Sequence, residues 1–105
     1  MADDLAPLFA RIRELTAAAD EDTTLRRNEV ERTLTEGYAR ALELDAECLR
    51  LEERIDRLTR AVAAERDVPP EQLSELLRRL NRTEQRSANL RALLEPLRAL
   101  VVKAA

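Results

Sequence analysis

Apolar residues recur at alternating spacings of four and three through the middle of the chain. None of the positions at this spacing is charged: they are Val30, Leu34, Gly37, Ala41, Leu44, Cys48, Leu51, Ile55, Leu58 and Val62. A repeat of about 3.5 residues is typical of the buried seam of a coiled coil. The pattern therefore predicts a long helix over residues 24–66.

The same spacing returns towards the end of the sequence. Its positions are Leu73, Leu76, Leu80, Thr83, Ser87, Leu90, Leu94, Leu97 and Val101, of which only Thr83 and Ser87 are polar. This predicts a second long helix over residues 70–103, with Pro70 suited to its first turn. Because the residue before a proline avoids helical backbone angles, we expect a turn at residues 67–69.

A short connection between two long helices predicts an antiparallel hairpin. If the seam positions pair outward from the turn, Val62 lies opposite Leu76 and Gly37 lies opposite Val101. A register shifted by one heptad would lengthen the loop and leave Val62 without a partner. We therefore expect the unshifted register.

A shorter amphipathic pattern precedes the two seams. Leu5, Leu8, Ile12, Leu15 and Ala19 share one face, which predicts a helix over residues 5–20. The capping residues of DEDTT (residues 20–24) favour a break there, although one helix from about residue 5 to residue 66 is an alternative. The expected fold is all-α, a single helical domain over residues 1–105 in which the short helix joins an antiparallel coiled-coil hairpin.

Five large apolar side chains lie beside the two seams, where a two-helix hairpin would leave them in water. Burial of each contributes roughly 1.5–3 kcal/mol. The short helix can cover one flank, and the other flank favours a second copy of the chain, giving a homodimeric helical bundle. These candidate interaction residues are Tyr38, Leu42, Leu49, Leu93 and Leu100.

Two irregular residues fall in the same half of the predicted hairpin. The heptad pattern continues through Pro96 without a change of phase, although an internal proline costs a helix roughly 3 kcal/mol. This predicts a kinked helix that continues past the proline. Gly37 has no side chain, so it lets a facing helix come close.

Composition argues against enzymatic chemistry. The chain has no histidine, the commonest general base and metal ligand, and its single cysteine and single glycine do not suffice for a thiolate cluster or a phosphate-binding loop. Adjacent carboxylates such as Glu52 and Glu53 are typical of solvated helix faces. The sequence therefore predicts a non-enzymatic protein with no catalytic residue, no metal site and no cofactor.

The charged residues supply one further candidate surface. A net charge of −3 argues against general binding to nucleic acids or anionic membranes. Arg78, Arg79, Arg82 and Arg86 nevertheless form a basic face on the last predicted helix. A solvated face is the simpler interpretation, because neither aromatic residue lies in this segment to stack on bases.

Neither end nor middle of the sequence predicts membrane insertion or export. The chain begins with the acidic stretch MADDLAPLF, which does not have the pattern of a signal peptide, and no apolar run approaches the length of a membrane span. We therefore expect a cytoplasmic protein.

Three functions remain open. The favoured one is a structural or adaptor module that acts as a homo-oligomer through protein–protein contacts, with its partner unidentified. The second follows from the layout of short helix, long helix, proline-containing turn and leucine-rich final helix, which resembles small flagellar-type export chaperones in general plan and in no specific motif. The resemblance implies binding of a client helix and a mobile C-terminal segment. The third is a nucleic-acid-associated protein that binds through the arginine face.

Overall fold

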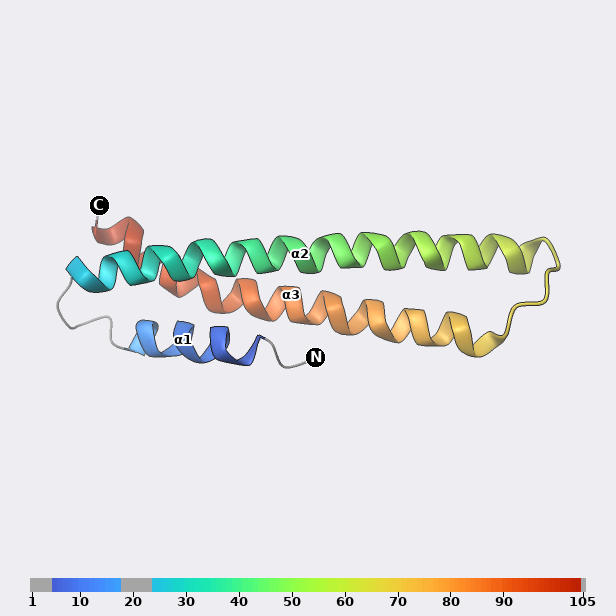
Figure 1. Ribbon diagram of the computed structural model, residues 1–105, viewed down its shortest axis with the longest axis horizontal. Helices are drawn as coiled ribbons and strands as arrows, with labels where there is room; N and C mark the ends of the chain where they lie inside the picture. Colours follow the sequence, from blue (N-terminus) through green and yellow to red (C-terminus); the bar gives the residue numbers. More distant parts are fainter. Residues whose placement is uncertain (1–4, 18–23, 105) are drawn as a thin grey trace. The chain divides into compact units, whose positions relative to one another are not determined.

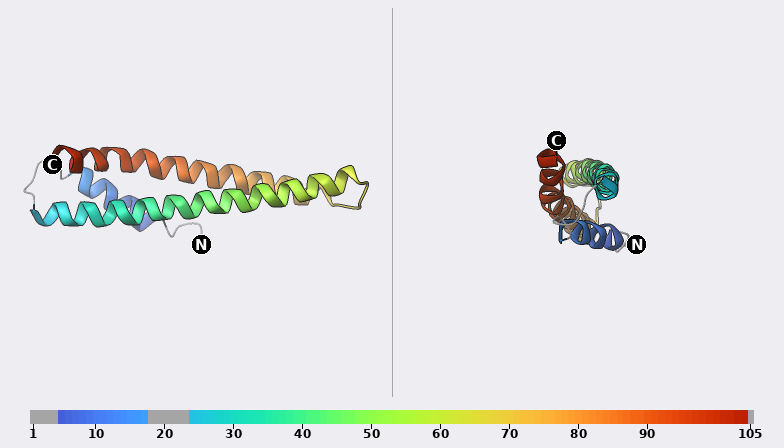
Figure 2. Two further views of the ribbon diagram at one scale, coloured as in Figure 1. Left: turned by 90° about the horizontal axis from the view of Figure 1, so that it is seen from above. Right: turned by 90° about the vertical axis from the view of Figure 1, so that its left-hand side faces the viewer.

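All secondary-structure elements of the described residues are α-helices. The computed structural model describes residues 5–17 and 24–104, which form α1 (Ala6–Ala17), α2 (Thr24–Ala63) and α3 (Pro70–Ala104) (Figure 1). The two long helices lie side by side in the views of Figure 1 and Figure 2. The all-helical class and the packing of α2 with α3 are therefore confirmed, whereas the predicted break at residues 20–23 lies outside the described residues.

The chain divides into two compact units. The first comprises Met1–Ala41 and Ala88–Ala105, and thus α1 with the adjoining parts of α2 and α3. The second comprises Leu42–Ser87, and thus the rest of the two long helices with the loop between them.

Three helices build the apolar core of the first unit. Each contributes one face of residues at spacings of three or four, as expected of helices that bury a single stripe. The side chains of Ile12, Leu90, Leu94 and Leu97 are completely buried. Among the described residues of this unit, the buried ones are Leu5, Leu8, Ile12, Leu15, Val30, Thr33, Gly37, Ala41, Leu90, Leu94 and Leu97.

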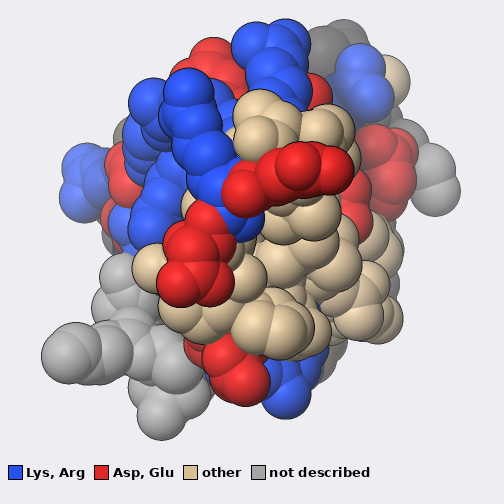
Figure 3. Space-filling model, turned by 90° about the vertical axis from the view of Figure 1, so that its right-hand side faces the viewer, with Lys and Arg blue, Asp and Glu red and all other residues tan. Residues whose placement is uncertain are grey.

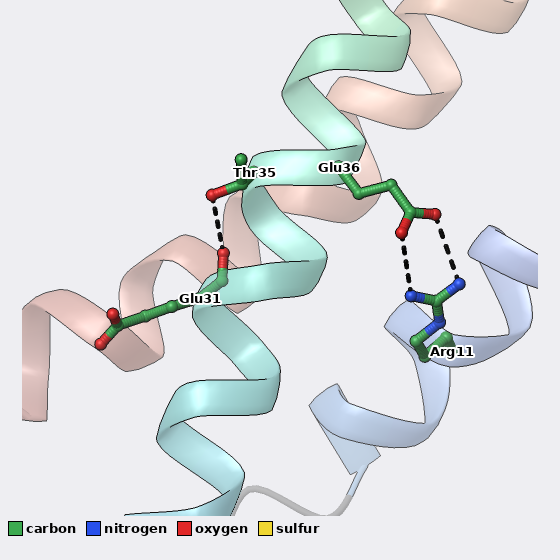
Figure 4. Close-up of polar contacts among 4 residues, drawn as sticks. All are labelled: Arg11, Glu31, Thr35 and Glu36. Carbon is green, nitrogen blue, oxygen red and sulfur yellow. Dashed lines mark hydrogen bonds and ion pairs between the residues drawn. The ribbon is translucent and has the colours of Figure 1, made fainter.

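A pair of hydrogen bonds joins α1 to α2 on the surface of the first unit. The two terminal nitrogens of Arg11 donate to the two carboxylate oxygens of Glu36 at 3.2 and 3.3 Å (Figure 4). Because these side chains are 35% and 45% exposed, the pair contributes only about 0–1 kcal/mol. In the same view the Thr35 hydroxyl donates to the carbonyl oxygen of Glu31 at 3.0 Å, within α2. Apolar burial therefore holds α1 in place.

Gly37 is the point of close approach between α2 and α3 in the first unit. A Cβ atom added at Gly37 would lie 2.5 Å from Cδ2 and 3.3 Å from Cγ of Leu94, so Leu94 fills the space of the missing side chain. The unshifted register predicts Val101 at this place. That register is therefore wrong, and the observed one is displaced by one heptad.

The second unit shows a shift of nearly the same size. The Ser87 hydroxyl donates to Oδ1 of Asp45 at 2.8 Å, whereas the unshifted register sets Ser87 opposite Leu51. The loop is correspondingly longer, and Val62 is 51% exposed. Lengthening a loop costs little, about 0.6 kcal/mol for each doubling. The fit of the facing side chains outweighs the loss of one buried valine.

The C-terminus of α2 explains why the helix ends at Ala63 and not at residue 66. The amide of Arg66 donates to the carbonyl of Ala61 at 2.9 Å, and the amide of Glu65 donates to the carbonyl of Val62 at 3.0 Å. Glu65 has a φ of 61°, in the left-handed region. These are the features of a Schellman motif, which usually has glycine at the left-handed position. A glutamate there gives no such signal in the sequence.

We predict that Gly37→Ala is destabilising by about 1 kcal/mol. Alanine is favoured over glycine in a helix by about 0.8–1.0 kcal/mol, but overpacking a core costs typically about 1–3 kcal/mol, and the fully buried Leu94 has little room to move. In a Leu94→Ala background the same substitution should become stabilising. Urea unfolding of the four proteins, followed by circular dichroism, measures this cycle. The same sign in both backgrounds would show that the contact does not constrain the helices.

We also predict that Thr33→Val stabilises the protein by about 1 kcal/mol. Thr33 is 1% exposed and its hydroxyl has no hydrogen-bond partner, which costs about 1–3 kcal/mol. Valine has nearly the same shape without the hydroxyl. Thr35→Val is the control on the exposed face of the same helix and should change the free energy of unfolding by less than about 0.5 kcal/mol. Destabilisation by Thr33→Val would contradict the prediction.

Candidate interaction surfaces

The five apolar residues predicted to mediate interaction have different environments. In the first unit Tyr38, Leu93 and Leu100 are half-buried. In the second unit Leu42 and Leu49 are 66% and 61% exposed. Of the five, only these two leucines present most of their side chain to solvent.

Leu42 and Leu49 belong to one stripe on the outer face of α2. With about 100° of rotation per residue, Leu42, Ala46 and Leu49 lie on one side of the helix. Leu44 and Leu51, which are 6% and 2% exposed, lie on the other side and are buried in the second unit. We call Leu42, Ala46 and Leu49 the α2 stripe. This stripe faces away from the buried seam of the second unit.

Pro96 lies inside α3, which continues to Ala104. Because proline has no amide hydrogen, the carbonyl of Ala92 receives no helical hydrogen bond from residue 96. Both Pro96 and Ala92 are exposed, whereas Leu94 and Leu97 are completely buried. The missing hydrogen bond therefore falls on the solvent side of the helix, where water can satisfy the carbonyl, and the buried side of α3 is undisturbed.

The predicted basic face of α3 is not uniform. Arg78 and Arg82 lie 3.0 and 3.9 Å from the two carboxylate oxygens of Glu75, so this carboxylate partly offsets their charges within the helix. Arg86 is half-buried and also takes part in a polar or electrostatic contact. Arg79 is exposed and forms no ion pair with the described residues. The four arginines therefore differ in how much of their charge is available to a partner.

An open cleft of about 330 Å³ lies between α2 and α3 in the second unit. Its residues follow helical spacing on both sides, which places one stripe of α2 opposite one stripe of α3. Figure 3 views the molecule from the end that carries the loop and shows Lys and Arg side chains gathered on one side of that face. We call the cleft between α2 and α3 the arginine cleft. Its lining residues are Arg54, Arg57, Leu58, Gln72, Glu75, Leu76 and Arg79.

The sequence interpretation missed the α2 side of the arginine cleft. The unshifted register sets Arg54 beside Arg86, close to the middle of α3. In the structure Arg54 and Arg57 line the same cleft as Gln72 and Arg79. The spacing of Arg54 and Arg57 places both on one face of α2, but which residues of α3 lie opposite that face depends on the register.

Cys48 is half-buried in the second unit, on the α2 side. Burial raises the pKa of its thiol, and the carboxylates of Glu84, Asp45, Glu52 and Glu47 raise it further. The thiol therefore stays protonated at neutral pH. Because the thiolate is the nucleophile, this environment weakens the reactivity of Cys48.

The described residues form neither a metal site nor a membrane-spanning helix. Within residues 5–17 and 24–104, no group of three or more His, Cys, Asp and Glu residues is placed to hold a metal ion. None of the described helices combines the length and apolar character needed to cross a membrane. No known protein family, curated protein or solved structure matches this chain.

Proposed function

We propose that the protein is a non-enzymatic helical interaction module that self-associates through the α2 stripe. The supporting observation is the exposure of Leu42 and Leu49, at 66% and 61%, on one face of α2. A single exposed leucine is common on protein surfaces. Two of them about two turns apart on the same face, with an alanine between them, make an apolar surface that favours contact with another helix.

The thin core of the second unit supports the same proposal. Its buried apolar residues are few, and two of its buried seam positions are the polar Thr83 and Ser87. Two helices that share one seam bury little apolar area, and helices without tertiary packing are marginal in water. A second copy placed on the α2 stripe adds a new apolar layer. The completed assembly is a four-helix bundle over this part of the chain. In one copy of the chain, the buried apolar residues of the second unit are Leu44, Leu51 and Leu76.

The α2 stripe is self-complementary about Ala46. If two copies of α2 meet antiparallel around a two-fold axis at Ala46, Leu42 of one copy lies within about one residue of the level of Leu49 of the other. The small side chain at the centre allows the helices to come close.

The export-chaperone alternative requires the last helix to release apolar surface. In the first unit, however, Leu90, Leu94 and Leu97 are completely buried. Removing three such leucines from their packing costs roughly 1.5–3 kcal/mol each. This burial favours a last helix that stays in place, and so favours the structural module over the chaperone.

We expect sedimentation analysis at micromolar concentrations to give a dimer for the unmodified chain and a monomer for the double variant Leu42→Glu/Leu49→Glu. The carboxylates cannot be buried unpaired in an apolar contact, so association should weaken by at least about a hundredfold. Leu77→Glu is the matched control, because Leu77 is 49% exposed on α3 and lies outside the stripe.

Two results would contradict the proposed self-association. A monomer for the unmodified chain would remove the proposal, and loss of the dimer in Leu77→Glu alone would place the contact on α3. Circular dichroism of all variants should show unchanged helix content, since each substituted side chain is about half exposed or more.

Hydrogen exchange separates the structural module from the chaperone. We expect the backbone amides of residues 90–101 to exchange as slowly as those of residues 44–58, because the last helix is packed in the first unit. Fast exchange confined to residues 90–101 would favour the chaperone. The measurement uses the unmodified chain, so it does not depend on how a variant folds.

A further inference from the structure

The arginine cleft has a charge balance unlike that of the whole chain. Three of its seven lining residues are arginines and one is a glutamate, in a chain whose net charge is −3. Arg54, Arg57 and Arg79 are exposed and form no ion pair with the described residues. Their guanidinium groups are therefore available to an anionic ligand.

The one acidic residue of the cleft is already engaged from outside it. Nη2 of Arg78 lies 3.0 Å from Oε2 of Glu75, and Nη2 of Arg82 lies 3.9 Å from Oε1 of the same carboxylate. Neither of these two arginines lines the cleft. Arg78 and Arg82 offset the charge of Glu75. The lining of the cleft therefore keeps an excess of positive charge from its three arginines.

The base of the cleft is apolar. Leu76 is 4% exposed and Leu58 is half-buried, and both line the cavity together with the arginines. A ligand that fits this arrangement carries carboxylates or phosphates for the arginines and an apolar group for the leucines. The volume of about 330 Å³ suits a few side chains.

The apolar base favours a peptide over a nucleic acid. Binding of single-stranded nucleic acid relies on aromatic side chains that stack on bases, and no aromatic residue lines the cleft. The carboxylate of Glu75 within the lining also disfavours a continuous phosphate backbone. Carboxylates instead match the planar fork of arginine, which binds them through two parallel hydrogen bonds.

We propose that the arginine cleft binds a short acidic segment of a partner protein. Carboxylate side chains of the segment pair with Arg54, Arg57 and Arg79, and a neighbouring apolar side chain rests on Leu58 and Leu76. The proposal does not depend on self-association, because the α2 stripe and the cleft share no residue.

Fluorescence anisotropy with the full chain tests the proposal. The probe is a fluorescein-labelled peptide that repeats Glu-Glu-Leu, and the comparison probes are the same peptide with Gln in place of Glu and a single-stranded DNA oligonucleotide. We expect saturable binding of the acidic peptide only. The double variant Arg54→Gln/Arg57→Gln and the single variant Arg79→Gln should each weaken this binding about tenfold or more.

Arg32→Gln is the matched control, because Arg32 is exposed on α2 in the first unit and its loss changes the net charge by the same amount as the loss of Arg79. It should leave the affinity within about twofold, as a charge distant from the contact does in screened solution. Equal weakening by Arg32→Gln and Arg79→Gln would show attraction to the whole chain and overturn the proposal. Tighter binding of the oligonucleotide, reduced by the cleft variants, would overturn it in favour of a nucleic-acid ligand.

Chemical-shift mapping on the unmodified chain keeps the test independent of variant stability. Addition of the acidic peptide should move the amide signals of residues 54–58 and 72–79 most strongly. Shifts centred on any other segment, or no shift at peptide concentrations that saturate the anisotropy signal, would overturn the proposal.

Discussion

The register between α2 and α3 is the constraint on which the rest of the structure depends. In the first unit Leu94 occupies the space left open by Gly37, and in the second unit Ser87 donates to Asp45. Both contacts require a shift of about one heptad from the register that gives the shortest loop. The consequences are a longer loop, an exposed Val62 and an arginine pair of α2 that lines a cleft with α3.

The seams were predictable from the sequence and their register was not. Most positions of both heptad patterns are apolar, so sliding one helix by a heptad still sets apolar residues opposite apolar residues. The choice between registers falls to a few individual residues, such as Gly37 and Ser87, whose fit depends on side-chain shape and hydrogen bonding. The end of α2 was hidden for a related reason, because Glu65 adopts a left-handed conformation that sequence patterns assign to glycine.

The candidate surfaces were predictable to different degrees. Leu42 and Leu49 stand out in the sequence because they are apolar at positions outside the seam, and their exposure needs only the helical period. The arginine cleft needs the register, since Arg54 and Arg57 belong to one helix and Arg79 to the other. Ion pairing within α3 also separates Arg79 from Arg78 and Arg82, a difference that spacing alone does not give.

The two units differ in how many apolar side chains they bury and in which candidate surfaces they carry. Large aliphatic side chains from three helices are buried in the first unit, which can therefore tolerate the interruption at Pro96 and the unsatisfied hydroxyl of Thr33. The second unit buries fewer, and it carries both the α2 stripe and the arginine cleft. A thin seam leaves the outer face of α2 and the loop end of the two helices available for contacts of different chemistry, one apolar and one ionic. Because the two surfaces share no residue, the proposed self-association and the proposed binding of an acidic segment can be tested separately by substitution.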